Sequence, residues 1–166
     1  MPVSRRTLIQ SGVGMVLASS LPRVAFSELS LGSSTLTTVS DGRLTLPASF
    51  VFDPMPQDEL APIRREFELE GDQLQPECNL ALYRDGTNTV LFDVGSGPDF
   101  MPTAGKILDA LDAVDVAPED VTHVIFTHAH PDHIWGLLDE FDEPLFYEAS
   151  YMMGRAEWDY WWNPNT

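Results

Sequence analysis

The sequence predicts an α/β fold in which strands and helices alternate around a sheet. Residues 121–126 form a short, apolar, β-branched run that is typical of a buried strand. Pro131 and the apolar residues 134–138 then indicate a helix that follows this strand after a short loop. Residues 104–114 are predicted to form an amphipathic helix, because apolar side chains recur there at helical spacing. Together these observations favour a strand-loop-helix unit as the centre of the domain.

The N-terminal elements are predicted from alternation and turn residues. Residues 34–40 alternate weakly, Asp41-Gly42 reads as a turn, and residues 43–46 would return as a second strand. Residues 50–76 are rich in proline and acids, so we expect an irregular lid or entry segment with a short helix near residues 63–67.

Two further pairs of strands frame the predicted strand at residues 121–126. Residues 78–84 and 88–93 read as a hairpin joined by Asp85-Gly86. Residues 144–147 and 150–152 are predicted to be strands, and the chain is expected to end in a helix over residues 155–162.

The loop after the central strand concentrates metal-binding residue types. Three of the four histidines lie within six residues, at His128, His130 and His133, and Asp132 stands between the last two. Zinc readily takes imidazole nitrogens and carboxylate oxygens as ligands. Because His128 and His130 alternate with Ala129, both point to one side of an extended backbone. Asp132 and His133 are adjacent and diverge, so we expect each pair to begin a separate metal site.

This pattern resembles the His-x-His-x-Asp-His motif of the metallo-β-lactamase superfamily. Residues 90–97 resemble the family's strand that ends in Asp-x-Gly, and the similarity covers residues 34–162. The resemblance implies the N-terminal αβ half of an αββα sandwich, with two zinc ions per complete domain and iron or manganese as alternatives. It also implies that Asp132 is catalytic, ligating one metal and orienting the nucleophile. Asp93 would support a metal-bound histidine through that ring's free N–H, or would simply form a turn.

The pattern departs from the family after the motif. Family members complete the site with a third histidine, a bridging aspartate and a last histidine, yet no histidine follows His133. We therefore expect residues 28–166 to form the N-terminal part of the domain, with the C-terminal half absent. Such a half would supply two ligands to each metal, bind metal weakly, and expose an apolar sheet face.

The resemblance implies a hydrolase in which a metal-bound hydroxide attacks a small ester, lactone or related substrate. Two alternatives remain open at this point. One is a mononuclear iron dioxygenase of the same fold, acting on a thiol-derived substrate. The other is a metal-binding remnant without catalytic activity.

Other conspicuous residues are predicted to be structural. His123 lies within a strand and is expected to be a hydrogen-bonded core histidine. Trp135 occupies a position where the family has a small residue; core packing is favoured over a wall for an apolar substrate. Cys78 is the single cysteine, so it excludes an internal disulfide, and we assign it no catalytic role. Helical spacing predicts a core or domain-interface role for Trp158, Trp161 and Trp162.

The N-terminus resembles a twin-arginine export signal, with Arg5-Arg6 followed by apolar residues 8–21. That apolar stretch is shorter than the ~20 residues that span a bilayer. Small residues near Ser27 suit a cleavage site, so residues 1–27 are predicted to be a signal that engages the twin-arginine machinery. The expected location is the periplasm or the medium of a bacterium, without stable membrane insertion after cleavage. A disordered basic terminus or an uncleaved anchor is the alternative.

The charge balance restricts the possible ligands. The chain carries nine Lys and Arg against 26 Asp and Glu, a net charge of -17. Removal of the signal takes away Arg5, Arg6 and Arg23, which leaves six basic residues and a net charge of -20. Because phosphate contacts need clustered Lys and Arg, nucleic acid is an unfavourable partner and a small-molecule substrate is expected.

Overall fold

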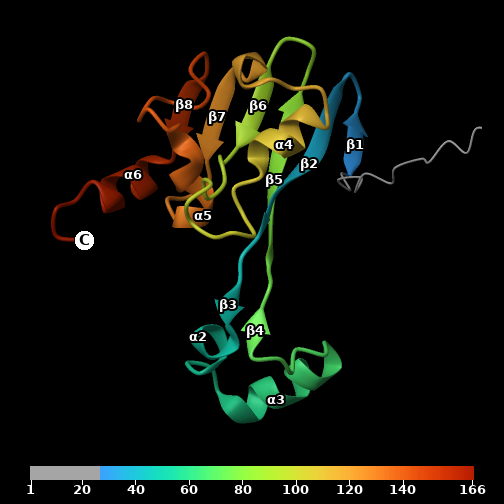
Figure 1. The fold of residues 1–166 in the computed structure, drawn as a ribbon, viewed down its shortest axis with the longest axis vertical. Coiled ribbons are helices and arrows are strands. Elements are labelled where there is room, and N and C mark those ends of the chain that lie inside the picture. The colour runs from blue at the N-terminus through green and yellow to red at the C-terminus, as the bar shows by residue number, and fades with distance from the viewer. Residues whose placement is uncertain (1–26) are drawn as a thin grey trace, which may run out of the picture.

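A computed structural model describes residues 27–166 as a six-stranded mixed sheet with helices against one face and a long ribbon extending from it (Figure 1). The order of strands in the sheet is β1-β2-β5-β6-β7-β8. These strands are β1 (Glu28–Leu31), β2 (Ser34–Arg43), β5 (Glu77–Arg84), β6 (Thr89–Phe92), β7 (His123–Phe126) and β8 (Ser150–Met153). The helices of the main body are α4 (Ile107–Asp112), α5 (Pro131–Ile134) and α6 (Arg155–Trp161), with short 3-10 turns at η1 (Pro118–Asp120) and η2 (Trp135–Leu137). The predicted α/β class is therefore confirmed.

The first part of the sheet differs from the prediction at Asp41-Gly42. The expected turn is wrong, because β2 continues through both residues and pairs with β5 across a register shift between Ser40 and Arg43. Gly42 adopts a φ of 101°, and a Cβ there would lie 2.2 Å from the carbonyl oxygen of Thr103. The segment is thus a bulge that only glycine fits, not a chain reversal.

Beyond this bulge, the chain forms a ribbon with its own small core. Strands β3 (Leu46–Pro47) and β4 (Gln73–Leu74) pair antiparallel and carry α2 (Ala48–Phe52) and α3 (Gln57–Glu66) away from the sheet (Figure 1). The buried side chains of this unit are Ala48, Phe52 and Leu60. The prediction of a short helix in an irregular segment located the helix too late, since α3 begins six residues earlier.

The second part of the sheet is parallel. The predicted strands at residues 78–84 and 88–93 are confirmed as the antiparallel pair β5 and β6. Strand β7 then pairs parallel with both β6 and β8. The carboxyl ends of these three strands therefore meet at one edge of the sheet. The strand predicted at residues 144–147 is wrong: this segment makes a single bridge, between Pro144 and Leu138, and the side chain of its Phe146 is fully buried in the core.

The core lies between the sheet and its helices. Leu82, Leu91 and Val124 are fully buried there against Ile107 and Leu111 of α4. Each such side chain stabilises the fold by about 1.5–3 kcal/mol through burial. The opposite sheet face, which includes Leu36, Tyr83, Phe92 and Ile125, is only half-buried. This apolar second face agrees with the expectation for half of a two-layer sandwich.

The tryptophans are not part of this core. Trp135 is 60% exposed, so the favoured prediction of core packing is wrong. The chain turns into η2 at this residue, and its ring packs edge-to-face on Phe100. Trp158 and Trp161 of α6, and Trp162 directly after it, are also exposed in the described chain.

Within residues 27–166, none of the helices is both long and apolar enough to cross a membrane. The predicted signal over residues 1–27 lies almost wholly outside the described residues.

Candidate metal centre

The histidine loop lies at the carboxyl edge of the parallel strands. Strand β7 ends at Phe126, and α5 begins at Pro131, a residue whose fixed φ and missing N–H suit the first position of a helix. His130 precedes it in extended backbone. The predicted strand-loop-helix arrangement is therefore confirmed, and it places the motif at the edge where Asp93 leaves β6.

Asp93 is the anchor of this loop. It is 6% exposed and adopts a positive φ of 64°, which turns its carboxylate toward the neighbouring strand end. One oxygen, Oδ1, accepts the Thr127 backbone N–H at 2.8 Å. The other, Oδ2, accepts the Thr127 hydroxyl at 2.7 Å and lies 2.8 Å from His133 Nδ1. A single buried carboxylate thus ties the start of the loop to the helix that follows it.

This network assigns the tautomers of two histidines. Asp93 is acceptor-only as a carboxylate, so His133 carries its proton on Nδ1 and presents a free lone pair at Nε2. The Thr127 hydroxyl donates its one proton to Asp93, so it accepts from His128 Nδ1, 3.0 Å away. His128 therefore also presents its Nε2. Both rings are prepared for a cation by the same carboxylate.

The three imidazoles form one cluster. The ring centroids of His128 and His133 are 3.9 Å apart, and those of His128 and His130 are 4.5 Å apart. Asp132 Oδ2 lies 3.4 Å from His133 Nε2. The predicted ligands are thus neighbours, although His128 lies closer to His133 than to its expected partner His130.

The types of ligand suit zinc, but the ligands do not converge on a single metal position. Neutral imidazoles with free Nε2 atoms and one adjacent carboxylate match the ligand preferences of zinc. Within the described residues, however, no three His, Cys, Asp or Glu side chains converge on one position suited to a metal ion. Further ligands are needed to close either site.

Two residues lie near the loop that the sequence did not connect with it. Glu157 of α6 accepts the Ala129 N–H at 2.9 Å, between the first two histidines of the motif. Cys78 of β5 lines a cavity of about 80 Å³ together with Asp132 and His133. Burial raises the pKa of the Cys78 thiol to about 11, with smaller contributions from the Asp132 and Asp41 carboxylates. Both residues reach the loop by tertiary contact, so no local pattern marks them, whereas Thr127 could have been noticed from its place beside His128.

His123 is separate from this cluster. Its Nδ1 lies 2.8 Å from the Thr122 hydroxyl, and its ring lies on the half-buried face of the sheet. The prediction of a hydrogen-bonded structural histidine is confirmed.

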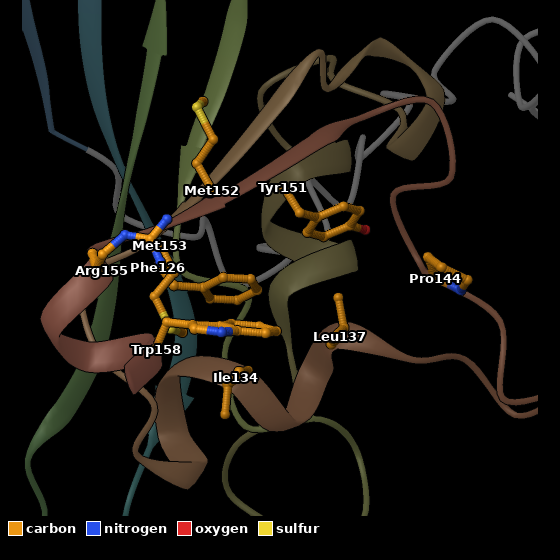
Figure 2. Close-up of a pocket in the computed structure, with 9 residues that line it drawn as sticks. All are labelled: Phe126, Ile134, Leu137, Pro144, Tyr151, Met152, Met153, Arg155 and Trp158. Atoms are coloured by element: carbon orange, nitrogen blue, oxygen red, sulfur yellow. The ribbon is translucent and has the colours of Figure 1, made fainter. Parts of the chain in front are cut away.

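Two apolar cavities are lined by residues that precede or follow the motif in the sequence. The first, of about 490 Å³, lies between β7, β8, α5 and α6, and Figure 2 shows Phe126 and Trp158 directed into it. Phe126 and Ile134 flank the motif on either side and both line this cavity. The second, of about 600 Å³, is lined by Phe100 and Trp135 on the helical side of the sheet.

The fold and this site define an α/β protein with a histidine-rich loop at the carboxyl edge of its parallel strands. The sequence model of the metallo-beta-lactamase superfamily matches residues 76–153. Metallo-beta-lactamase domain-containing protein 1 of Mus musculus is 44% identical over 75 residues, which are 42% of this chain and 26% of the mouse protein. The protein of the same name from Xenopus laevis is 35% identical over 91 residues, 55% of this chain and 34% of its own length.

Solved structures agree with the sequence matches. AidC, a dizinc quorum-quenching lactonase in complex with a product, superposes with a TM-score of 0.75 at 28% identity, covering 84% of this chain and 48% of AidC. The hydrolase AbOPH of the beta-lactamase superfamily gives 0.74 at 25% identity, covering 85% of this chain and 48% of that protein. Residues 76–153 therefore match the metallo-β-lactamase superfamily, and the fold of the described chain is similar to part of the domain in these structures. The chain spans about half the length of these structures and a quarter to a third of the curated relatives.

Proposed function

We propose that this chain carries the metal-binding loop of a metal-dependent hydrolase that acts on small neutral esters or lactones. The observation that carries the proposal is the Asp93 network. One buried carboxylate, acting directly on His133 and through Thr127 on His128, leaves the Nε2 atoms of both rings free to bind a cation.

Each residue of the motif has a role in this proposal. His128 and His130 would hold one zinc ion, and Asp132 and His133 a second, with further ligands completing both sites. Iron or manganese could replace zinc in the same donor set. When bound, the metal would lower the pKa of a water molecule and withdraw charge from the carbonyl of the substrate. Asp132 would orient the nucleophile and accept or relay its proton at the carboxylate.

The substrate class follows from chemistry and similarity. The net charge of -17 opposes polyanionic ligands, which favours a neutral substrate. AidC, which is 28% identical over most of this chain, is a lactonase. The cavity lined by Phe126 and Ile134 supplies apolar surface directly beside the loop. A small ester or lactone with an apolar substituent is the class that these observations support.

The test uses the protein purified from its native host, with its intact mass measured first. The purified protein is analysed for metal content and assayed with a short-chain acyl ester and an N-acyl homoserine lactone. His128→Ala should lower hydrolysis by more than about a hundredfold, the usual scale for a lost ligand network. His123→Ala removes an imidazole outside the loop and serves as the control. Unchanged activity in His128→Ala would favour the non-catalytic remnant, and iron with a requirement for O₂ would favour the dioxygenase.

We also propose that the protein is exported by the twin-arginine machinery to the periplasm or the medium. Arg5-Arg6 and the apolar residues 8–21 support this location. Replacing both arginines by lysine keeps the charge and should hold the protein in the cytoplasm, as measured by cell fractionation. Continued export of this variant would contradict the proposal.

A further inference from the structure

We infer that Glu157 is a positioning residue for the histidine pair of the metal loop. The inference rests on the proposed function, since it concerns the element that would bind the metal. Glu157 lies in the first turn of α6, which follows β8 directly. Because β8 runs parallel to β7, with Met153 opposite Phe126, α6 begins at the same edge of the sheet as the loop.

The contact is made at the centre of the His-x-His segment. Glu157 Oε1 accepts the backbone N–H of Ala129 at 2.9 Å. Ala129 separates His128 from His130, so this bond fixes the peptide that determines where both rings point. The same oxygen accepts Trp161 Nε1–H at 2.7 Å, one helical turn further along α6. The Trp161 hydrogen bond thus fixes the position of the carboxylate, and the carboxylate in turn restrains the loop at Ala129.

The aromatic ring of Trp161 extends this contact to the second histidine. Its centroid lies 6.4 Å from that of His130, with an interplanar angle of 83°, an edge-on arrangement. The Ala129 N–H lowers the pKa of Glu157 most, followed by Trp161, and His128 and His130 lower it further. Glu157 is thus a carboxylate beside the loop at neutral pH.

Two effects could link Glu157 to metal binding, and they can be separated. As a hydrogen-bond acceptor, the side chain restrains the loop and reduces the entropy lost when both rings bind one ion. As an anion, it attracts a cation irrespective of loop geometry. Glu157→Gln keeps an acceptor oxygen for Ala129 and removes the charge, whereas Glu157→Ala removes both. If Glu157 acts by positioning the loop, Glu157→Gln should keep most of the zinc affinity that Glu157→Ala loses.

The experiment measures zinc binding by competition with a chromogenic chelator, in the full chain and with zinc as the only probe. Glu157→Ala should weaken zinc binding by about tenfold, the lower end of the effect of ligand-supporting residues. Glu157→Gln should lie within about threefold of the unmodified protein. Asp159→Asn, on the same helix, is the matched control and should have no effect, because within residues 27–166 Asp159 pairs with Arg155 alone, at 3.8 Å.

A second readout excludes a purely structural role and does not depend on metal. The imidazole NMR resonances of His128 and His130 should shift in metal-free Glu157→Ala but not in Asp159→Asn, while the thermal midpoint of both variants stays close to that of the unmodified protein. Unshifted imidazole resonances, equal losses in the glutamine and alanine variants, or a loss of zinc binding that parallels unfolding would each overturn the inference. If the unmodified chain binds no zinc, the proposed function fails, and the imidazole resonances alone decide the role of Glu157.

Discussion

Replacing Asp41 should destabilise the whole domain, although this residue lies in no predicted site. Its side chain is fully buried at the end of β2. One oxygen, Oδ2, accepts Ser96 N–H and Ser96 Oγ–H at 2.9 Å each, and Gly105 N–H at 3.2 Å. The other, Oδ1, accepts Ile107 N–H at 3.0 Å. Asp41 therefore joins β2 to both ends of the segment that leads from β6 into α4.

The magnitude follows from these four bonds. Asp41→Ala leaves three backbone N–H groups without their acceptor, each at a cost of about 1–3 kcal/mol when buried. Relief of the cost of burying a carboxylate offsets part of this sum. We expect a net loss of about 3–6 kcal/mol, a large fraction of the ~5–15 kcal/mol by which domains are stable. Asp41→Asn keeps the shape and one acceptor oxygen, so it should lose about half as much.

Chemical denaturation of the full chain, followed by tryptophan fluorescence and circular dichroism, measures the loss. Ser96→Ala is the matched control, because it removes a single hydroxyl donor and should cost no more than about 1.5 kcal/mol. The reasoning would be refuted by an Asp41→Ala variant within about 1 kcal/mol of the unmodified protein. It would also fail if Ser96→Ala proved the more damaging substitution.

Three further predictions concern the loop and its surroundings. Asp93→Asn keeps a residue that tolerates positive φ but places an amide against the Thr127 and His133 donors. Zinc affinity should therefore fall by about tenfold or more in a chelator competition. An affinity within twofold of the original would contradict this prediction. Gly136→Ala would place a Cβ 2.3 Å from a backbone oxygen and should lower the free energy of unfolding by about 1–3 kcal/mol, measured by chemical denaturation. The control Gly154→Ala, whose added Cβ meets nothing within 4 Å, should be neutral. Equal losses in the two variants would contradict the prediction. Since the pKa of Cys78 is raised from 9.0 to about 11, the thiolate is scarce at pH 8. Iodoacetamide should therefore alkylate the metal-free protein about a hundredfold more slowly at pH 8 than it alkylates an unshifted thiol, and the rate should rise toward pH 11. A rate at pH 8 equal to that of a free cysteine would disprove the shift.

The sequence predicted the elements that carry a clear local signal. Helix α4 was predicted from the helical spacing of its apolar residues, β7 from its short apolar and β-branched run, and β5 and β6 from the hairpin around Asp85-Gly86. Asp41-Gly42 misled this reasoning, since the pair is typical of a turn, and its partners Ser96 and Gly105 are distant in the chain. The prediction for residues 144–147 failed for another reason: an apolar run can bury its side chains in the core without pairing as a strand.

The site divides along the same line. The ligand motif and Asp93 were predicted because short sequence patterns carry them, and the structure places Asp93 against His133. Glu157 and Cys78 approach the loop only after β8 and β5 take their places in the sheet. Prediction from local pattern therefore reaches the residues of the loop but not the residues that other strands bring to it.

The ribbon between β2 and β5 can be altered without affecting the main sheet of this domain. Its two legs remain hydrogen-bonded as they leave the sheet, from Arg43 opposite Glu77 to Leu46 opposite Leu74, and its helices are packed on a core of their own (Figure 1). Loop closure depends only weakly on length, about 0.6 kcal/mol for each doubling. Residues 44–76 can therefore be lengthened, exchanged or cut back to a tight turn while the register of the main sheet stays the same. Changes to the length or sequence of this segment would leave the histidine loop and its anchoring carboxylate unaltered.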